Sequence, residues 1–355
     1  MNPFNPEMLI LARESRGLTQ KGLAENIPPI QQGTVSKLEA GLYTPSEELL
    51  GRLAEALDYP PEFFQLSDRV YGFNSAVFFH RKQQSMPDRV LRRLHAFMNL
   101  SRIRVSRLLR ASELSVKAGF QRIETADYRG GAEEIAQIVR ATWQVPMGPL
   151  RNVTEAIENA GGVVVRMDFG TRKADAISEW IPGYPPIFLV NSDAGIPGDR
   201  LRLTLAHEIA HVIMHRLPNP KMEEEANAFA AELLMPRKQI KASLYGLTIA
   251  KLVQLKRIWK VSMAALIHRA HDLGTITDAQ RKYLYITMSK KGYRLQEPAG
   301  EDVPVERPAL LGTLTRMHLD QLGYSFNELK NLLLFRGEAD MRSVYLGVGN
   351  LKLVG

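Results

Sequence analysis

The stretch His207-Glu208-Ile209-Ala210-His211 constrains this chain more than any other part of its sequence. No proline or glycine lies within residues 204–215, which predicts one continuous helix through the stretch. Residues four apart share a helix face, so both imidazoles can reach a single ion, as in the HExxH pattern of zinc hydrolases. Glu208 falls on the neighbouring face, where its carboxylate can accept a proton from an attacking water and pass it to a leaving amine. The pattern predicts a catalytic Zn2+ site with Glu208 as the base of peptide hydrolysis.

A third ligand is required, because catalytic zinc usually takes three protein ligands and keeps one position for water. Residues 222–236 predict a second helix that Pro236 ends. Glu223 shares one face of this helix with small or neutral side chains, namely Ala226, Asn227 and Ala230. Such a face can lie close against the first helix. We therefore expect Glu223 to complete the ligand set with His207 and His211.

Four other side chains near these ligands have predicted supporting or surface roles. Asn227 is expected to orient a ligating side chain, since it lies one turn beyond the acidic ligand on the same face. His215 would lie about 12 Å from the first histidine along a continuous helix. We therefore expect His215 to support or pack against the site rather than to bind the ion. Glu224 and Glu225 are expected on a solvated, charged face.

Residues 200–211 and 223–236 together resemble the ImmA/IrrE-type metallopeptidases, and the resemblance extends over about residues 130–275. It implies a zincin-like fold of the gluzincin type, with the three ligands named above and Glu208 as the base. Some members of that family cleave a transcriptional repressor when a stress or mobile-element signal arrives. The resemblance therefore implies a protein substrate of the repressor or antitoxin type.

Two strands are predicted upstream of the HExxH helix, at residues 161–169 and 186–191. Both are β-branched or aromatic runs between turn residues. The second run ends just before the catalytic helix. It is expected to be either the sheet edge that pairs with an extended substrate or an interior strand of a small sheet.

The first 68 residues predict a separate domain of five short helices. Thr19 and Ser46 are expected to cap the second and fourth helices, Gly41 closes the third, and Pro60-Pro61 starts the fifth. A tight helix-turn-helix at the second and third helices is typical of small DNA-binding modules.

This domain resembles the XRE, or Cro-repressor-type, helix-turn-helix family over about residues 7–65. The resemblance is carried by Gln20 and by residues 34–39 followed by a glycine. It implies that the start of the third helix enters the major groove of double-stranded DNA. The residues expected to contact DNA are Gln20, Gln31, Gln32, Thr34, Ser36 and Lys37.

Charge is distributed unevenly between this domain and the next segment of the chain. Residues 1–66 carry five basic and nine acidic side chains, so DNA contact there must depend on local placement. The bases expected near the DNA face are Arg13, Arg16, Lys21 and Lys37. Residues 81–110 then carry nine basic side chains against Asp88 alone. This block predicts either contact with DNA phosphates or a solvated helix that links two domains.

The whole chain is expected to be mainly α with a small β-sheet, an α+β fold. Its 355 residues suit two or three domains. The expected divisions are a helix-turn-helix domain at 1–68, a basic helical linker at 69–128, a zinc metallopeptidase domain at 129–289 and a helical region at 290–355. For the last region a sensor, a dimer interface and a lid all remain open.

Composition is compatible with this organisation. The chain has no cysteine, no segment like a signal peptide and no apolar run of eighteen residues, which favours a soluble, cytoplasmic protein with no membrane partner. Its formal charge of +8 fits a polyanionic partner. The expected partners are double-stranded DNA, a protein substrate and, as a homodimer, a second copy of the chain.

These features support three functional hypotheses. The first is a DNA-bound zinc endopeptidase that cuts a repressor, an antitoxin or itself. The second is a transcription regulator whose peptidase-like domain senses a ligand without turnover. The third is one half of a toxin–antitoxin or phage-defence pair. The first is favoured, because Glu208 is not needed to hold an ion and yet is present.

Overall fold

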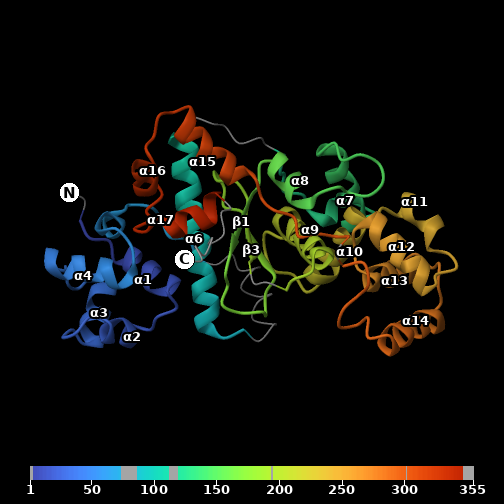
Figure 1. Ribbon diagram of the computed structural model, residues 1–355, viewed down its shortest axis with the longest axis horizontal. Coiled ribbons are helices and arrows are strands. Elements are labelled where there is room, and N and C mark those ends of the chain that lie inside the picture. The colour runs from blue at the N-terminus through green and yellow to red at the C-terminus, as the bar shows by residue number, and fades with distance from the viewer. Residues whose placement is uncertain (1–2, 73–85, 112–118, 193–194, 301, 347–355) are drawn as a thin grey trace, which may run out of the picture.

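The computed structural model describes residues 3–72, 86–111, 119–192, 195–300 and 302–346. These residues form a mainly helical protein with one small three-stranded sheet (Figure 1), as the sequence predicts. No helix among them is long and apolar enough to cross a lipid bilayer. His80, Arg81 and Lys82 lie outside the described residues.

The amino-terminal helices form a small domain with its own apolar core. Their bounds are α1 (Pro6–Ser15), α2 (Gln20–Glu25), α3 (Gln32–Glu39), α4 (Glu47–Leu57) and the 3-10 helix η1 (Pro61–Gln65). Both predicted caps are confirmed: the Thr19 side chain accepts a hydrogen bond from the Gly22 amide, and that of Ser46 accepts one from the Leu49 amide. The fifth predicted helix forms as a 3-10 turn, because only five residues are available to it.

Helix α6 (Asp88–Ala111) connects this domain to the rest of the molecule. Figure 1 shows it between the helices α1–α4 and the sheet. One side of α6 belongs to the core of the amino-terminal domain, through Ala96, Leu100 and Ile103. The other side belongs to a core beneath the sheet, through residues that include Leu94, Met98, Val105 and Leu108. The predicted solvated linker is therefore wrong for this segment, because apolar side chains recur on both faces of the helix.

The sheet contains one strand that the sequence analysis did not predict. Its strands are β1 (Val163–Met167), β2 (Ala176–Glu179) and β3 (Ile187–Asn191), in the order β1-β3-β2. Strand β3 runs parallel to β1, with Val163 opposite Ile187, and antiparallel to β2, with Glu179 opposite the same Ile187. Of the two alternatives for this strand, the interior position is confirmed and the sheet edge is wrong, because β1 pairs with one side of β3 and β2 with the other. Helix α9 (Gly198–Met214) lies beside the edge strand β2.

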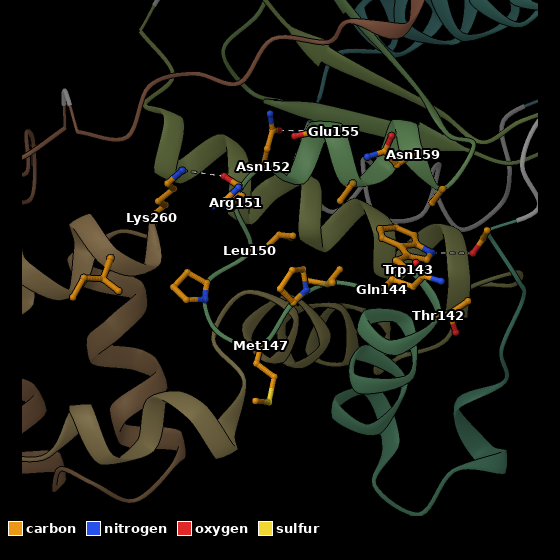
Figure 2. A pocket seen from close by; sticks show the side chains of 17 residues that line it. Thr142, Trp143, Gln144, Met147, Leu150, Arg151, Asn152, Glu155, Asn159 and Lys260 are labelled. Carbon is orange, nitrogen blue, oxygen red and sulfur yellow. Dashed lines mark hydrogen bonds between the residues drawn. The ribbon is translucent and has the colours of Figure 1, made fainter.

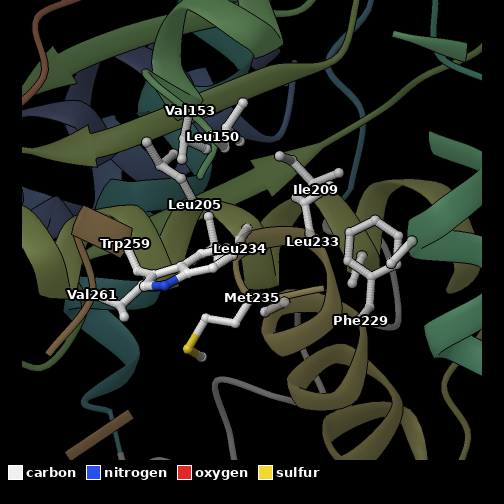
Figure 3. Close-up of a cluster of buried hydrophobic side chains, with 14 of the residues drawn as sticks. Leu150, Val153, Leu205, Ile209, Phe229, Leu233, Leu234, Met235, Trp259 and Val261 are labelled. Carbon is white, nitrogen blue, oxygen red and sulfur yellow. The ribbon is translucent and has the colours of Figure 1, made fainter. Parts of the chain in front are cut away.

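The opposite face of the sheet, with Val164 and Phe188, belongs to the largest apolar core, and the rest of that core comes mainly from helices. In chain order they are η2 (Thr125–Asp127), α7 (Gly131–Thr142), α8 (Val153–Asn159), α9 (Gly198–Met214), α10 (Met222–Leu234), α11 (Arg237–Ile240), η3 (Lys241–Leu244), α12 (Ile249–Trp259), α13 (Met263–Asp272) and α14 (Asp278–Lys290). Figure 3 shows part of this core, in which Leu205 and Ile209 of α9 lie near Phe229 and Leu233 of α10. The HExxH helix is therefore anchored on a buried apolar surface.

The carboxy-terminal helices return to α6. They are α15 (Leu310–Asp320), α16 (Phe326–Leu332), α17 (Glu338–Met341) and the π-helical turn η4 (Arg342–Leu346), and α15 and α16 pack against α6. The preceding segment 303–308 is held across α9: Glu306 accepts hydrogen bonds from buried Arg202 and from the Thr154 amide. Gly198 permits this crossing, because a Cβ there would collide with the Val303 carbonyl oxygen.

Candidate metal centre and nucleic-acid interface

Close packing of α9 on α10 brings the predicted ligands together. Two alanines of α10, Ala226 and Ala230, are almost completely buried on the side that faces α9. Their small side chains let the two helix axes approach, so that side chains four residues apart on α9 meet the first turn of α10. The small-residue face seen in the sequence therefore positions Glu223 opposite the two histidines.

The three predicted ligands present their donor atoms to one point. The Nε2 atoms of His207 and His211 are 2.9 Å apart, and the carboxylate oxygens of Glu223 lie 3.4 Å and 3.6 Å from them. One ligand atom from each residue lies within 4.8 Å of the others. Tetrahedral zinc with bonds of about 2.0–2.2 Å separates neighbouring ligand atoms by about 3.4 Å. The donor types and their spacing thus fit zinc.

The hydrogen bond to Asn227 sets the tautomer of His207. The Nδ1 atom of His207 lies 3.0 Å from the side-chain carbonyl oxygen of Asn227. Because that oxygen can only accept, Nδ1 carries the proton and Nε2 keeps a lone pair directed at Glu223 and His211. The structure thus places Asn227 where the sequence analysis expected it to orient a ligand.

A longer relay sets the tautomer of His211. Its Nδ1 atom lies 2.9 Å from Nδ1 of His215, and Nε2 of His215 lies 3.0 Å from the carboxylate of Glu225. Burial lowers the pKa of His215, although the hydrogen bond to Glu225 opposes this shift. A neutral His215 that donates to Glu225 must accept from His211, which leaves the Nε2 lone pair of His211 for an ion. The predicted solvated face is therefore wrong for Glu225, while Glu224 is exposed as expected.

Glu208 is buried beside the ligands and is held by the edge strand. Only 5% of the residue is exposed. The hydroxyl of Ser178 in β2 donates a 2.6 Å hydrogen bond to its carboxylate. The sequence analysis missed Ser178 because it missed β2: the strand has four residues, all buried, and shows no alternation. The local sequence around Ser178 carries no signal for this role, because its partner Glu208 lies on another element.

The predicted DNA-contacting residues lie along α3 and at the start of α2. Gln31, Gln32 and Lys37 are exposed, whereas Gln20, Thr34 and Ser36 are half-buried. The amide nitrogen of Gln32 donates to the amide oxygen of Gln20 at 3.2 Å, and Gln20 donates to Glu39 at 2.8 Å. These bonds join the first residues of α2 and α3 into one polar surface.

Two arginines expected near the DNA face make contacts within the domain. Arg13 is only 6% exposed, and its guanidinium is paired with Glu39 and donates to the Leu18 carbonyl. The prediction is therefore wrong for Arg13, because a long side chain on a short helix can turn inward to satisfy carbonyl groups at neighbouring helix ends. Arg16 donates to the carbonyl oxygen of Leu57 but stays exposed, so its place near the DNA face stays a prediction.

A separate hollow of about 1070 Å³ lies between α7 and α8 (Figure 2). It is lined mainly by the α7–α8 loop, where Met147 is exposed and Trp143 donates to the carbonyl of Gly119 at 2.8 Å. The Nζ atom of Lys260 donates to the carbonyl of Arg151 at 3.0 Å. None of the three ligand side chains lines this hollow, so it is distinct from the metal centre.

Comparison with protein families agrees with this division. Residues 9–64 match the helix-turn-helix family model, and residues 157–271 match that of the IrrE N-terminal-like domain. No curated protein matches the chain. The fold and these matches define a DNA-binding regulator that carries a peptidase-like domain. More particularly, the chain is a fusion of an XRE-type helix-turn-helix domain and an ImmA/IrrE-type metallopeptidase-like domain.

Proposed function

We propose that this protein is a zinc-dependent endopeptidase that acts in transcriptional control, cleaving a repressor, an antitoxin-like partner or itself. The observation that carries the proposal is the placement of Glu208. Its carboxylate is buried beside the ligand triad, is not one of the three ligands, and is fixed by Ser178. A site that only held an ion would not need a buried carboxylate at this position, which costs desolvation energy.

The roles of the side chains can be assigned from their contacts. His207, His211 and Glu223 would hold Zn2+, which when bound supplies Lewis acidity to the scissile carbonyl and the attacking water. Glu208 accepts the proton of that water and returns it to the leaving amine. Ser178 keeps the carboxylate turned toward the triad, Asn227 orients His207, and the pair His215 and Glu225 orients His211.

Recognition of DNA is assigned to the polar surface formed by α3 and the start of α2. The exposed side chains of Gln31, Gln32 and Lys37 can reach base edges in the major groove, where glutamine pairs with adenine and lysine with guanine. Gln20, Thr34 and Ser36 lie beside them and are suited to phosphate or base contacts. The cleavage activity would thus act from a DNA-bound position.

Substitution of Glu208 by glutamine tests the proposal. The Glu208→Gln protein should bind zinc as the wild type does, because the ligands are intact. Its cleavage rate should fall about 100-fold to 10,000-fold, the usual contribution of a general base. Cleavage is followed by mass spectrometry of new amino termini after the protein is incubated with a bacterial lysate, and in the chain itself.

The matched control is Glu224→Gln, which changes an exposed glutamate on α10 outside the cluster. It should leave both zinc binding and cleavage unchanged. Identical sets of new termini from the wild type and the Glu208→Gln protein would refute the peptidase. Together with unchanged regulation by that variant, this result would favour a regulator that senses without turnover.

A further inference from the structure

The arginines of α6 divide into those that the fold covers wholly or in part and those that stay exposed. The helix carries seven arginines and a single acid. Four arginines contact protein groups: Arg93 stacks on Phe97, Arg102 on Tyr71, Arg104 on Phe335, and Arg107 pairs with Asp68. Arg110 is exposed in the last turn of the helix. The remaining two, Arg89 and Arg92, are exposed in the first turns of α6.

Arg89 and Arg92 lie directly beside the DNA-reading surface. Together with Gln20, Lys21 and Gln32 they line an open hollow of about 690 Å³. The Nε atom of Arg89 donates to the carbonyl oxygen of Gly17, next to the start of α2. This bond fixes the side chain at the junction of the two domains.

The guanidinium of Arg92 remains accessible although an acid lies near it. Its side chain is 65% exposed, and Nη1 lies 3.7 Å from the carboxylate of Glu14, too far for a strong hydrogen bond. Glu14 is itself close to Arg13, at 3.7 Å. The other acids lining the hollow are Glu39, which is paired with Arg13, and exposed Asp88.

We propose that Arg89 and Arg92, together with Lys21, bind the phosphate backbone of the duplex that α3 reads, so that the DNA interface extends from the helix-turn-helix domain onto α6. The inference rests on the proposed DNA-reading role of α3. Residues 1–66 carry five basic against nine acidic side chains. The net electrostatic attraction between this domain alone and the DNA phosphates is therefore weak. Two arginines on the adjoining helix halve this deficit of four positive charges, and guanidinium groups match phosphate geometry well.

The test is the salt dependence of binding to a random-sequence duplex by the full chain. The logarithm of the association constant falls linearly with the logarithm of the salt concentration, and each phosphate contact that a substitution removes should lower the magnitude of this slope by about 0.9. Arg92→Gln should therefore lower the slope by about 0.9, and Arg89→Gln with Arg92→Gln by about 1.8. Arg92→Lys keeps the charge and should keep the slope.

Arg257→Gln is the matched control. Arg257 lies on α12, its side chain is 59% exposed, and it also has an acidic neighbour, Asp302, at 2.7 Å. It should leave the slope unchanged. An unchanged slope for Arg92→Gln, or an equal fall for Arg257→Gln, would overturn the proposal while leaving the role of α3 intact. Failure of the wild type itself to bind the duplex would overturn both.

Discussion

The proposed metal centre and the proposed DNA-reading surface differ in how their side chains are held. At the metal centre each histidine ligand has its second nitrogen fixed by a further side chain, and the base is buried under a serine hydroxyl. On the DNA side the residues most able to reach bases are exposed, and Gln31 and Lys37 project from a short helix. Chemistry at a fixed ion demands preorganised groups, whereas reading DNA demands groups that the partner itself can order.

The largest expected difference concerns how strongly the buried core of the peptidase-like domain and the exposed surface near α3 contribute to the free energy of unfolding. Phe229→Ala should destabilise the peptidase-like domain by about 3–5 kcal/mol, because it empties a fully buried site between α9 and α10. All three tryptophans lie in residues 143–259, so their fluorescence during denaturant unfolding follows this domain. Leu42→Ala, at a residue 79% exposed after α3, should change stability by less than about 0.5 kcal/mol. Equal effects would erase the contrast.

The next effect tests the relay behind His211. Glu225→Ala removes the acceptor of His215, so His211 is no longer held in the tautomer that faces the ion. Zinc affinity should fall about 10-fold to 100-fold, measured by competition with a chelator. Glu224→Ala provides the control on the same turn. If both variants bind zinc as the wild type does, the relay does not prepare the ligand.

A smaller effect is expected for one DNA-reading side chain. Gln32→Ala should weaken binding to a preferred duplex, selected by the wild type from a random library, by about tenfold, since one base contact is worth about 1–3 kcal/mol. Binding to non-specific duplex should stay the same, because no phosphate charge is lost. Gln321→Ala changes an exposed glutamine on the carboxy-terminal helices and should have no effect. Equal losses on both duplexes would exclude base reading by Gln32.

The smallest effect is local to the helix-turn-helix domain. Ser46→Ala removes the cap of α4, whose hydroxyl accepts a 3.2 Å hydrogen bond from the Leu49 amide. The cost should be about 1 kcal/mol, visible as faster hydrogen exchange of α4 amides. Ser46→Asp retains an acceptor and should exchange like the wild type. Unchanged exchange in Ser46→Ala would show that packing alone holds this helix end.

Prediction from sequence succeeded where a local pattern determines the structure. The spacing of His207 and His211 and the small-residue face around Glu223 are periodic within single helices, so the ligand cluster could be predicted without the fold. Ser178 and Glu225 could not be assigned roles, because their partners lie in other elements. The role of Arg13 failed for the same reason: its partner Glu39 is 26 residues away.

Strand order and the linking helix also lay beyond local patterns. Strand β2 is too short and too uniformly buried to show a period of two, so the sequence could not decide between an edge and an interior position for β3. For α6 the density of arginines suggested a solvated helix, although its apolar residues repeat along two faces. The number of charged residues describes the composition of a helix, whereas its burial depends on which other elements of the fold pack against it.

Because α6 contributes side chains to two cores, the helix-turn-helix domain is not free to rotate relative to the peptidase-like domain. When α3 binds a duplex, the ligand triad therefore takes a fixed angular position around the axis of the DNA helix. A second protein bound to the same duplex lies on the same side of the DNA as the triad when the two sites are separated by whole turns of about 10–10.5 base pairs. It lies on the opposite side when the separation is longer by half a turn. The number of base pairs between the two binding sites would thus decide which DNA-bound proteins the peptidase-like domain can reach and cleave.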